Sequence, residues 1–214
     1  MNVYFIPGLG ADKRVFRHIA LDKGLNMICL DWIDPEPHES LPHYALRLAA
    51  EIDTSRLWAL VGLSFGGMLA AEISAQLHPQ KTVLISSIPS PQQLPPYFKA
   101  VAPLHLQNIL PVGLFKQASV AKRVFTTETA EDKALLRQII DDSDPAFIRW
   151  ALGAILGWKS SRQPAPVVHI HGDSDFLLPA RYVKPTHLIK NAGHLLVMNH
   201  AGEVNKILHE VFAA

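Results

Sequence analysis

The sequence predicts an α/β protein with a doubly wound, mostly parallel sheet and an inserted helical segment. Six short apolar runs, each about the length of a strand, alternate with longer segments of helical character. None of the six runs alternates polar with apolar side chains, which is typical of parallel strands covered by helices on both faces. The alternation stops after Ser87 and resumes at Val167, so the intervening residues form an insertion into the sheet region.

The elements of the sheet region can be placed along the chain. Helices are predicted over 42–52, 64–77 and 203–212, and in the first of these the apolar residues recur about every 3.6 positions. The predicted strands are 3–6, 27–30, 57–61, 82–86, 167–170 and 186–189. Strands alternating with helices in this way indicate one sheet built from residues 1–87 and 164–214.

Residues 88–163 contain no strand pattern and are predicted to form a helical cap. Six prolines between residues 89 and 111 are typical of loops and short helices. The pair Asp144-Pro145 is typical of a helix N-cap followed by a proline in the first turn. Helical patterns cover 120–125, 130–140 and 145–157.

The composition is that of a globular chain with one main domain. Of the 214 residues, 49% are hydrophobic and 18% are charged, which is enough to bury a large core. The net charge of +1 gives no reason to expect nucleic-acid binding. The single cysteine, Cys29, excludes an internal disulfide, and its apolar neighbours favour a buried thiol over a reactive one. The first residues lack the features of a signal peptide or membrane anchor, so we expect a cytoplasmic protein.

The strongest chemical signal is Gly62-Leu63-Ser64-Phe65-Gly66-Gly67, which follows one predicted strand and opens a helix. A serine on such a sharp turn has strained backbone angles and projects its oxygen above the sheet. Glycines two residues before and after the serine leave room where strand and helix backbones nearly touch. The helix N-terminus favours developing negative charge. The segment therefore predicts a nucleophile at Ser64, with a glycine-rich turn devoid of chemistry as the alternative.

A serine nucleophile needs a base and an acid that orients the base. In open α/β sheets such groups lie on loops at the carboxyl ends of the strands. One late strand runs into His171-Gly172-Asp173-Ser174-Asp175, and the next runs into Asn191-Ala192-Gly193-His194. This places a carboxylate and then a histidine after Ser64 in the chain, with Asp173 and Asp175 both available as the acid.

Together these motifs resemble the α/β-hydrolase superfamily, in particular its serine-nucleophile, esterase- and lipase-like branch. The resemblance covers the chain outside the cap and includes the Pro7-Gly8-Leu9-Gly10 turn after the first strand. It implies that Ser64 attacks, His194 takes the proton and Asp175 holds the imidazole. The usual position of the family acid favours Asp175 over Asp173, which we expect to cap its own turn.

The same resemblance implies an oxyanion hole made of two backbone N–H groups, those of Phe65 and Leu9. Here the sequence departs from the family, because Pro7 replaces the histidine that commonly precedes this glycine. A cap in this family roofs the active site. We expect most of the cap aromatics to form its own core and one or two to line the substrate pocket. These aromatics are Tyr97, Phe98, Phe115, Phe147, Trp150 and Trp158.

Two other groups of residues allow a metal-binding alternative. His169, His171 and His187 lie on neighbouring strands, but they lack an accompanying ligand pattern and are better explained as satisfied polar groups. The run Asp141-Asp142-Ser143-Asp144 lacks the glycine and terminal glutamate of a calcium loop, so a helix cap explains it better. We therefore expect no metal and no cofactor.

The leading functional prediction is a serine hydrolase that cleaves a small ester or thioester through an acyl-enzyme. We expect a small-molecule substrate, no nucleic acid and no stable membrane anchoring, and the sequence does not indicate an oligomeric state. One alternative is a lyase or transferase that uses the same three residues, because fold and triad do not fix the reaction. The other is a receptor that retains the hydrolase pocket and binds a small ligand.

Overall fold

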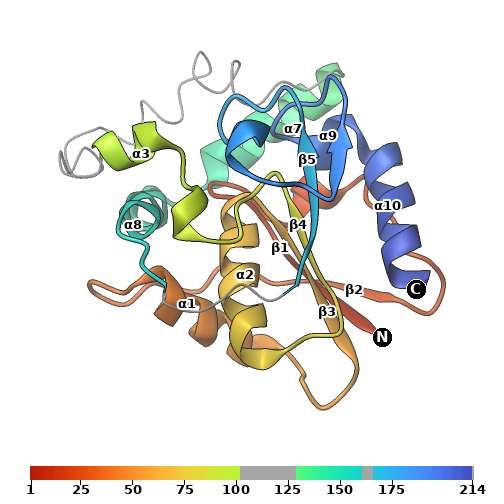
Figure 1. Ribbon diagram of the computed structural model, residues 1–214, viewed down its shortest axis with the longest axis horizontal. Coiled ribbons are helices and arrows are strands. Elements are labelled where there is room, and N and C mark those ends of the chain that lie inside the picture. Colours follow the sequence, from red (N-terminus) through yellow and green to blue (C-terminus); the bar gives the residue numbers. More distant parts are fainter. Residues whose placement is uncertain (102–128, 161–165, 214) are drawn as a thin grey trace.

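A computed structural model describes residues 1–101, 129–160 and 166–213 of the chain (Figure 1). The predicted helix over 120–125 and the predicted cap aromatic Phe115 lie outside the described residues. The division into a core and a cap at residues 88 and 163 stays a prediction.

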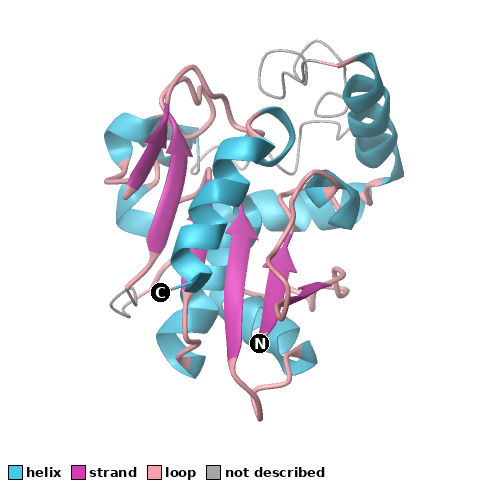
Figure 2. Ribbon diagram, turned by 90° about the vertical axis from the view of Figure 1, so that its right-hand side faces the viewer, coloured by secondary structure: helices cyan, strands magenta, loops and turns pink. Residues whose placement is uncertain are grey.

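The described residues form a six-stranded, fully parallel sheet with helices on both faces (Figures 1 and 2), which confirms the predicted fold class. The strand order is β2-β1-β3-β4-β5-β6, so the chain winds outward from β1 in both directions. Each predicted strand is present with its ends shifted by at most two residues. The strands are β1 Asn2–Ile6, β2 Asn26–Cys29, β3 Trp58–Leu63, β4 Thr82–Ile85, β5 Val168–Gly172 and β6 His187–Ile189.

Alternate side chains of β1 to β4 enter two separate hydrophobic clusters. Tyr4 and Ile6 of β1 lie in the cluster that contains residues of α1, α2 and α8. Val3 and Phe5 lie in the opposite cluster, with residues of α7, α9 and α10. Successive side chains of a strand point to opposite faces, so both faces of β1 are apolar. The helices are α1 Leu41–Leu48, α2 Phe65–Leu77, α7 Ala130–Asp142, α8 Pro145–Leu156, α9 Leu196–Asn199 and α10 Ala201–Ala213.

Side-chain caps define where three of these helices begin. The Asp144 carboxylate accepts hydrogen bonds from the N–H groups of Ala146 and Phe147, at 2.8 and 3.2 Å, and Pro145 occupies the first turn of α8. Thr129 and Ser40 cap α7 and α1 in the same way. These bonds satisfy N–H groups that have no partner within the helix. The cap interpretation of the aspartate run is therefore confirmed at Asp144.

Within the part of the chain that the structure describes, the aromatic residues of α8 pack on the sheet region and form no separate cap core, which corrects the sequence-based expectation. Phe147 and Trp150 contact Tyr44 of α1 and Phe65 of α2, with ring centroids between 4.4 and 6.4 Å apart. Helix α8 can do this because it lies directly against α1 (Figure 1). The inserted helix thus extends the hydrophobic cluster on its face of the sheet.

Short helical turns were not predicted from the sequence. They include a 3₁₀ turn over Lys13–Phe16, here called η1, and the short helix α3, Pro96–Val101. The helix predicted to reach residue 52 ends at Leu48, and a third such turn, Ala49–Glu51, follows it. A single turn contains too few residues for a helical period to be visible in the sequence.

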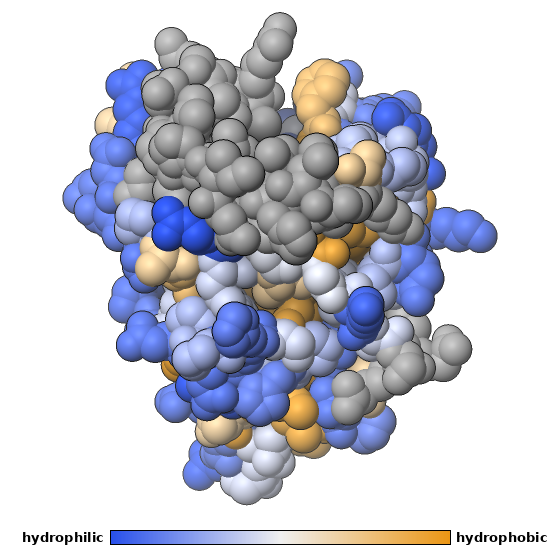
Figure 3. Space-filling model, turned by 90° about the vertical axis from the view of Figure 1, so that its left-hand side faces the viewer, coloured by the Kyte–Doolittle hydropathy of each residue, from blue (hydrophilic) through white to orange (hydrophobic). Residues whose placement is uncertain are grey.

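The surface on the α1 and α8 side is mainly hydrophilic outside the grey atoms, with apolar side chains in small separate patches (Figure 3). No helix among the described residues combines the length and the apolar character needed to cross a membrane. Cys29 is half-buried, and burial raises the pKa of its thiol above the ordinary value. A raised pKa lowers the thiolate fraction, in agreement with an unreactive cysteine.

Candidate active site

Ser64 lies at the sharp turn between β3 and α2 in a conformation that is unusual for a non-glycine residue. Its φ of 51° and ψ of −116° are strained. Its N–H donates to the carbonyl of Ile85 at 2.9 Å, and its own carbonyl accepts a hydrogen bond from the Ser87 hydroxyl at 2.6 Å. Contacts from the end of β4 therefore hold the strained turn in place.

The flanking glycines are required by the close approach of backbones at this turn. A Cβ atom at Gly66 would overlap the backbone carbonyls of Ile6 and Pro7, and one at Gly62 would overlap the carbonyl of Gly66. Neither neighbour is a flexible side chain that could move away. The absence of a side chain here allows α2 to begin directly above the ends of β1 and β3.

Three side chains predicted to act together lie in one line of hydrogen bonds. His194 Nε2 is 2.8 Å from Ser64 Oγ, and His194 Nδ1 is 2.8 Å from Asp175 Oδ2. Asp175 follows β5 and His194 follows β6, so both reach Ser64 from loops at the carboxyl edge of the sheet. Both side chains are almost fully buried. A base placed in this way can take a proton from the hydroxyl of Ser64.

Asp175 is held as a carboxylate by donors on both oxygens. Oδ1 accepts hydrogen bonds from the N–H groups of Leu177 and Leu178, both at 2.9 Å. Oδ2 faces His194 at 2.8 Å and His171 Nε2 at 3.3 Å. Burial alone would raise the pKa of Asp175. The nearby His194 and these hydrogen bonds outweigh burial and place the pKa far below its ordinary value.

The structure brings Asp175, and not Asp173, to His194. Asp173 is exposed, and its carboxylate accepts a hydrogen bond from the hydroxyl of Ser174 at 2.8 Å. Asp175 is 3% exposed. The two aspartates are only two residues apart, but the turn after β5 directs one to solvent and the other inward.

The two residues predicted to form the oxyanion hole lie beside the nucleophile. Phe65 is the first residue of α2. The turn that contains Leu9 approaches from β1, where a Cβ on Gly8 would lie 3.4 Å from Ser64 Cβ. Leu9 and Phe65 line the same pocket as Ser64 and His194. The role of their N–H groups stays a prediction.

A cavity of about 150 Å³ opens beside Ser64. The helices α7 and α8 contribute to its walls, together with the turn after β1 and the loop after Asp175. Of the predicted cap aromatics within the described residues, Phe98 lines this cavity, whereas Phe147, Trp150 and Trp158 belong to the core. The Tyr97 hydroxyl donates to the carbonyl of Leu177 at 2.5 Å.

Two histidines of β5 extend the line of polar groups behind Asp175, a contact that the sequence did not indicate. His171 Nε2 faces two oxygen acceptors, the Leu178 carbonyl at 2.6 Å and Asp175 Oδ2 at 3.3 Å, so it carries the proton. His171 Nδ1 is 3.0 Å from His169 Nε2. The sequence contains two histidines at alternate positions of a strand that ends at the site, which could have indicated a role there. It does not show which group they contact.

We expect His171 to position Asp175. Replacing His171 by leucine removes a donor to a buried carboxylate and is expected to lower kcat about 10- to 100-fold with little change in KM. The variant His171→Gln retains an N–H donor and should recover part of the lost kcat. Steady-state kinetics of both variants measure this difference. An equal loss in both, with KM altered, would indicate a purely structural role.

His169 is expected to make the protein less stable in mild acid. Burial and the neighbouring His171 lower the pKa of His169 from its ordinary 6.5 to about 4, against a smaller opposite effect of a backbone bond with Ser87. Between these two values the unfolded chain binds a proton that the folded protein does not. The free energy of unfolding therefore falls as the pH decreases from about 6.5 towards 4, by about 2 kcal/mol at pH 5.

Urea unfolding at pH 7.5 and 5 tests this expectation. The variant His169→Gln should lose less stability between the two pH values than the wild type. The control His187→Gln, at the partly exposed start of β6, should behave like the wild type. An equal pH dependence of all three proteins would contradict the assignment to His169.

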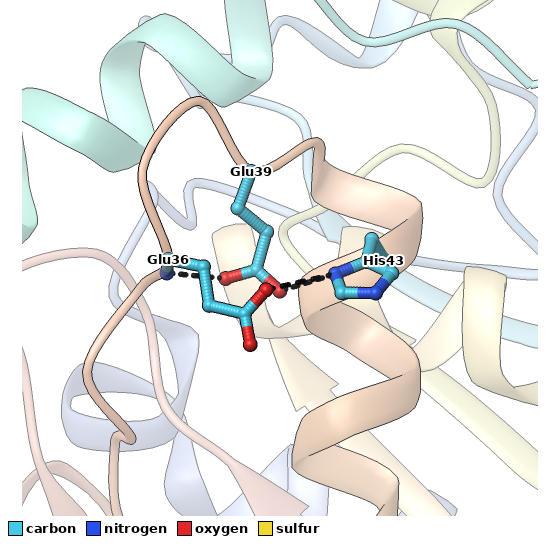
Figure 4. Close-up of side chains that lie close together, drawn as sticks. All are labelled: Glu36, Glu39 and His43. Carbon is cyan, nitrogen blue, oxygen red and sulfur yellow. Dashed lines mark hydrogen bonds and ion pairs between the residues drawn. The ribbon is translucent and has the colours of Figure 1, made fainter.

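Among the described residues, one group of possible metal ligands is close enough to bind an ion: Glu36, Glu39 and His43 (Figure 4). Glu39 is already neutralised. Its carboxylate pairs with His43 Nδ1 at 2.6 Å and with Arg47 at 2.9 Å, and accepts from the Glu36 N–H at 2.9 Å. These bonds outweigh burial and lower the pKa of Glu39. They anchor the loop that precedes α1 to the helix. This structural role accounts for the close approach of Glu36, Glu39 and His43 without a bound metal ion.

The alternative metal site at the strand histidines is not supported. His169 and His171 contact each other, whereas His187 Nδ1 lies 3.0 Å from the Thr186 hydroxyl. Within residues 1–101, 129–160 and 166–213, these three histidines do not form a group of possible ligands.

A parallel sheet with a strained serine at the turn after β3, and with a histidine reaching it from the loop after β6, defines a protein of the α/β-hydrolase type. The sequence of residues 3–207 matches the alpha/beta hydrolase family, and the chain belongs to that family. No curated protein matches the sequence.

Several solved structures share this fold. A thermophilic esterase from Thermogutta terrifontis is 17% identical, with a TM-score of 0.74 over 100% of this chain and 89% of the esterase. An esterase from Exiguobacterium antarcticum is 14% identical, with a TM-score of 0.74 over 100% of this chain and 92% of that protein. MenH from S. aureus is 17% identical, with a TM-score of 0.70 and coverage of 97% and 91%. Bromoperoxidases, an enol-lactonase and epoxide hydrolases also match, so the fold is common to several activities.

Proposed function

We propose that this α/β hydrolase cleaves small carboxylic esters or thioesters through an acyl-enzyme on Ser64. The observation that carries the proposal is the line of hydrogen bonds from Ser64 Oγ through His194 to Asp175, with both links at 2.8 Å. A serine hydroxyl needs a base within hydrogen-bond reach to act as a nucleophile, and that base needs a fixed orientation. A serine at this position also disfavours the dehalogenase and epoxide hydrolase reactions, in which relatives use aspartate.

In the proposed reaction, Ser64 Oγ attacks the carbonyl carbon while His194 Nε2 takes the hydroxyl proton. The N–H groups of Phe65 and Leu9 stabilise the negative charge that develops on the carbonyl oxygen. His194 then gives its proton to the leaving alcohol or thiol, and the acyl group remains on Ser64. Water then attacks the acyl-enzyme ester while His194 takes a proton from the water. His194 returns a proton to Ser64 Oγ, which releases the acid and restores the hydroxyl. Asp175 keeps Nδ1 protonated and stabilises the imidazolium form.

Hydrolysis in water enriched in ¹⁸O tests the proposal against its rivals. A panel of p-nitrophenyl esters and acyl thioesters is incubated with the protein, and the products are analysed by mass spectrometry. Hydrolysis places one ¹⁸O atom in each acid released. Elimination gives a product without ¹⁸O, transfer to an added alcohol gives a new ester, and a receptor retains the ligand unchanged. Any of the last three results, in the absence of labelled acid, would refute the proposed hydrolysis.

A further inference from the structure

The described residues give the cavity beside Ser64 an almost entirely apolar lining. Among the lining residues that the structure describes, only Ser64 and His194 have polar side chains, and both belong to the proposed catalytic machinery. The other walls are aliphatic or aromatic side chains and glycine backbone. They include Leu136 and Ile140 of α7 and Leu152 of α8. A ligand group that enters this cavity therefore leaves water without gaining a hydrogen bond from the walls.

The volume of the cavity limits the size of this group. At about 150 Å³, it matches the size of an apolar cavity that accommodates one benzene molecule. A linear or cyclic hydrocarbon group of about six carbons fills such a space. A longer chain would have to extend out of this space or displace packed side chains, since protein interiors are close to the packing density of organic crystals.

The described lining offers no partner to an ionised group. No lysine, arginine or acidic side chain of residues 1–101, 129–160 or 166–213 lines the cavity. A carboxylate at the end of a substrate chain would be desolvated there without a partner, which is far less favourable than burial of a methyl group. The pocket therefore discriminates between a neutral chain and a charged chain of similar length.

We infer that this cavity is the acyl pocket of the enzyme and selects uncharged, apolar acyl groups of about four to six carbons. The inference rests on the proposed function, because it assumes that a carbonyl is attacked by Ser64. The acyl part is favoured over the alcohol part because the acyl group stays on Ser64 after the alcohol has left. An apolar pocket holds the acyl group of that intermediate while water attacks it with His194 as the base.

Kinetics with p-nitrophenyl esters of two to twelve acyl carbons test the inference. We expect kcat/KM to be highest at four to six carbons and at least about tenfold lower at twelve. The charged ester p-nitrophenyl succinate should react at least about tenfold more slowly than the pentanoate. A second series, alkyl acetates with alcohols of increasing length, should show no comparable optimum. A flat acyl series, or an optimum in the alcohol series alone, would overturn the inference.

The variant Leu152→Ala enlarges the pocket from a half-buried position on α8. It should raise the ratio of kcat/KM for the octanoate to that for the butanoate about three- to tenfold. The matched control is Leu156→Ala, four residues further along the same helix. Leu156 is also half-buried, but it does not line the cavity, so this control should leave the ratio unchanged. A ratio that shifts equally in both variants would contradict the assignment of the pocket.

Binding to the Ser64→Ala variant separates the two proposals. Ethyl hexanoate should raise the Tm of this variant, whereas monoethyl succinate should not. If ethyl hexanoate stabilises the variant but no ester is hydrolysed by the wild type, the proposed function and the acyl assignment both fail, and only the preference of the cavity for uncharged, apolar groups stands. If Ser64-dependent hydrolysis occurs without a preference for acyl length or charge, the pocket assignment fails and the proposed function stands.

Discussion

Replacing Ser64 by alanine is expected to lower kcat for ester hydrolysis by about 10⁵-fold or more. The substitution removes the hydroxyl oxygen that lies 2.8 Å from His194 Nε2, so no covalent intermediate can form on residue 64. In other enzymes with a serine–histidine pair, loss of the nucleophile costs about 10⁶-fold in kcat, and the remaining rate comes from the oxyanion hole and binding. Steady-state hydrolysis of p-nitrophenyl butyrate by wild type and variant measures the loss.

Ser74 offers a matched control within the same helix. It is fully buried, and its hydroxyl donates to the carbonyl of Ala71 at 3.0 Å, away from the proposed site. The variant Ser74→Ala should keep kcat within a few-fold of the wild type. Circular dichroism and Tm verify that both variants are folded. A folded Ser64→Ala protein with more than a few per cent of wild-type activity would contradict a nucleophilic role for Ser64.

The variant Asp175→Asn is expected to lower kcat by about 10⁴-fold, the loss known for the equivalent change in a serine protease. Leu177 and Leu178 donate N–H groups to Oδ1, so the amide oxygen of asparagine takes that place. Its NH₂ group must then face His194 Nδ1. A donor at this position forces the proton of His194 onto Nε2, the atom that has to accept the proton of Ser64. The base is thus present but in the wrong tautomer.

The control for this variant is Asp173→Asn. Asp173 is exposed and contacts Ser174, so its replacement should change kcat by less than about threefold. Steady-state hydrolysis of p-nitrophenyl butyrate by both variants measures the difference, and Tm verifies that both are folded. If Asp173→Asn is the more damaging of the two changes, the assignment of the orienting acid is wrong.

The fold was predictable from the sequence because most strands contain a continuous apolar run. All of β3 and β4 are buried, and Thr82 at the start of β4 is the only polar residue in the two strands. The relative positions of Ser64, Asp175 and His194 were predictable for a related reason. Each follows a strand in the sequence, and the carboxyl ends of parallel strands lie along one edge of the sheet.

What could not be predicted depends on contacts between segments far apart in the sequence. The packing of Phe147 and Trp150 on α1 depends on the direction in which α8 crosses the sheet region, and helical periodicity does not contain that direction. The contact of His171 with Asp175 depends on the turn after β5 folding back over its own strand. The cavity is formed by side chains from at least five separate segments, each of which appears in the sequence as ordinary core.

Labelling with a fluorophosphonate probe tests directly whether Ser64 is an activated nucleophile, as its hydrogen bond to His194 and that of His194 to Asp175 imply. Mass spectrometry of the labelled protein locates the adduct, and the comparison includes Ser64→Ala and Ser74→Ala. We expect one adduct on Ser64 in the wild type and in Ser74→Ala, and none in Ser64→Ala. A folded wild-type protein that remains unlabelled, or one that carries the adduct on another residue, would contradict this role of Ser64.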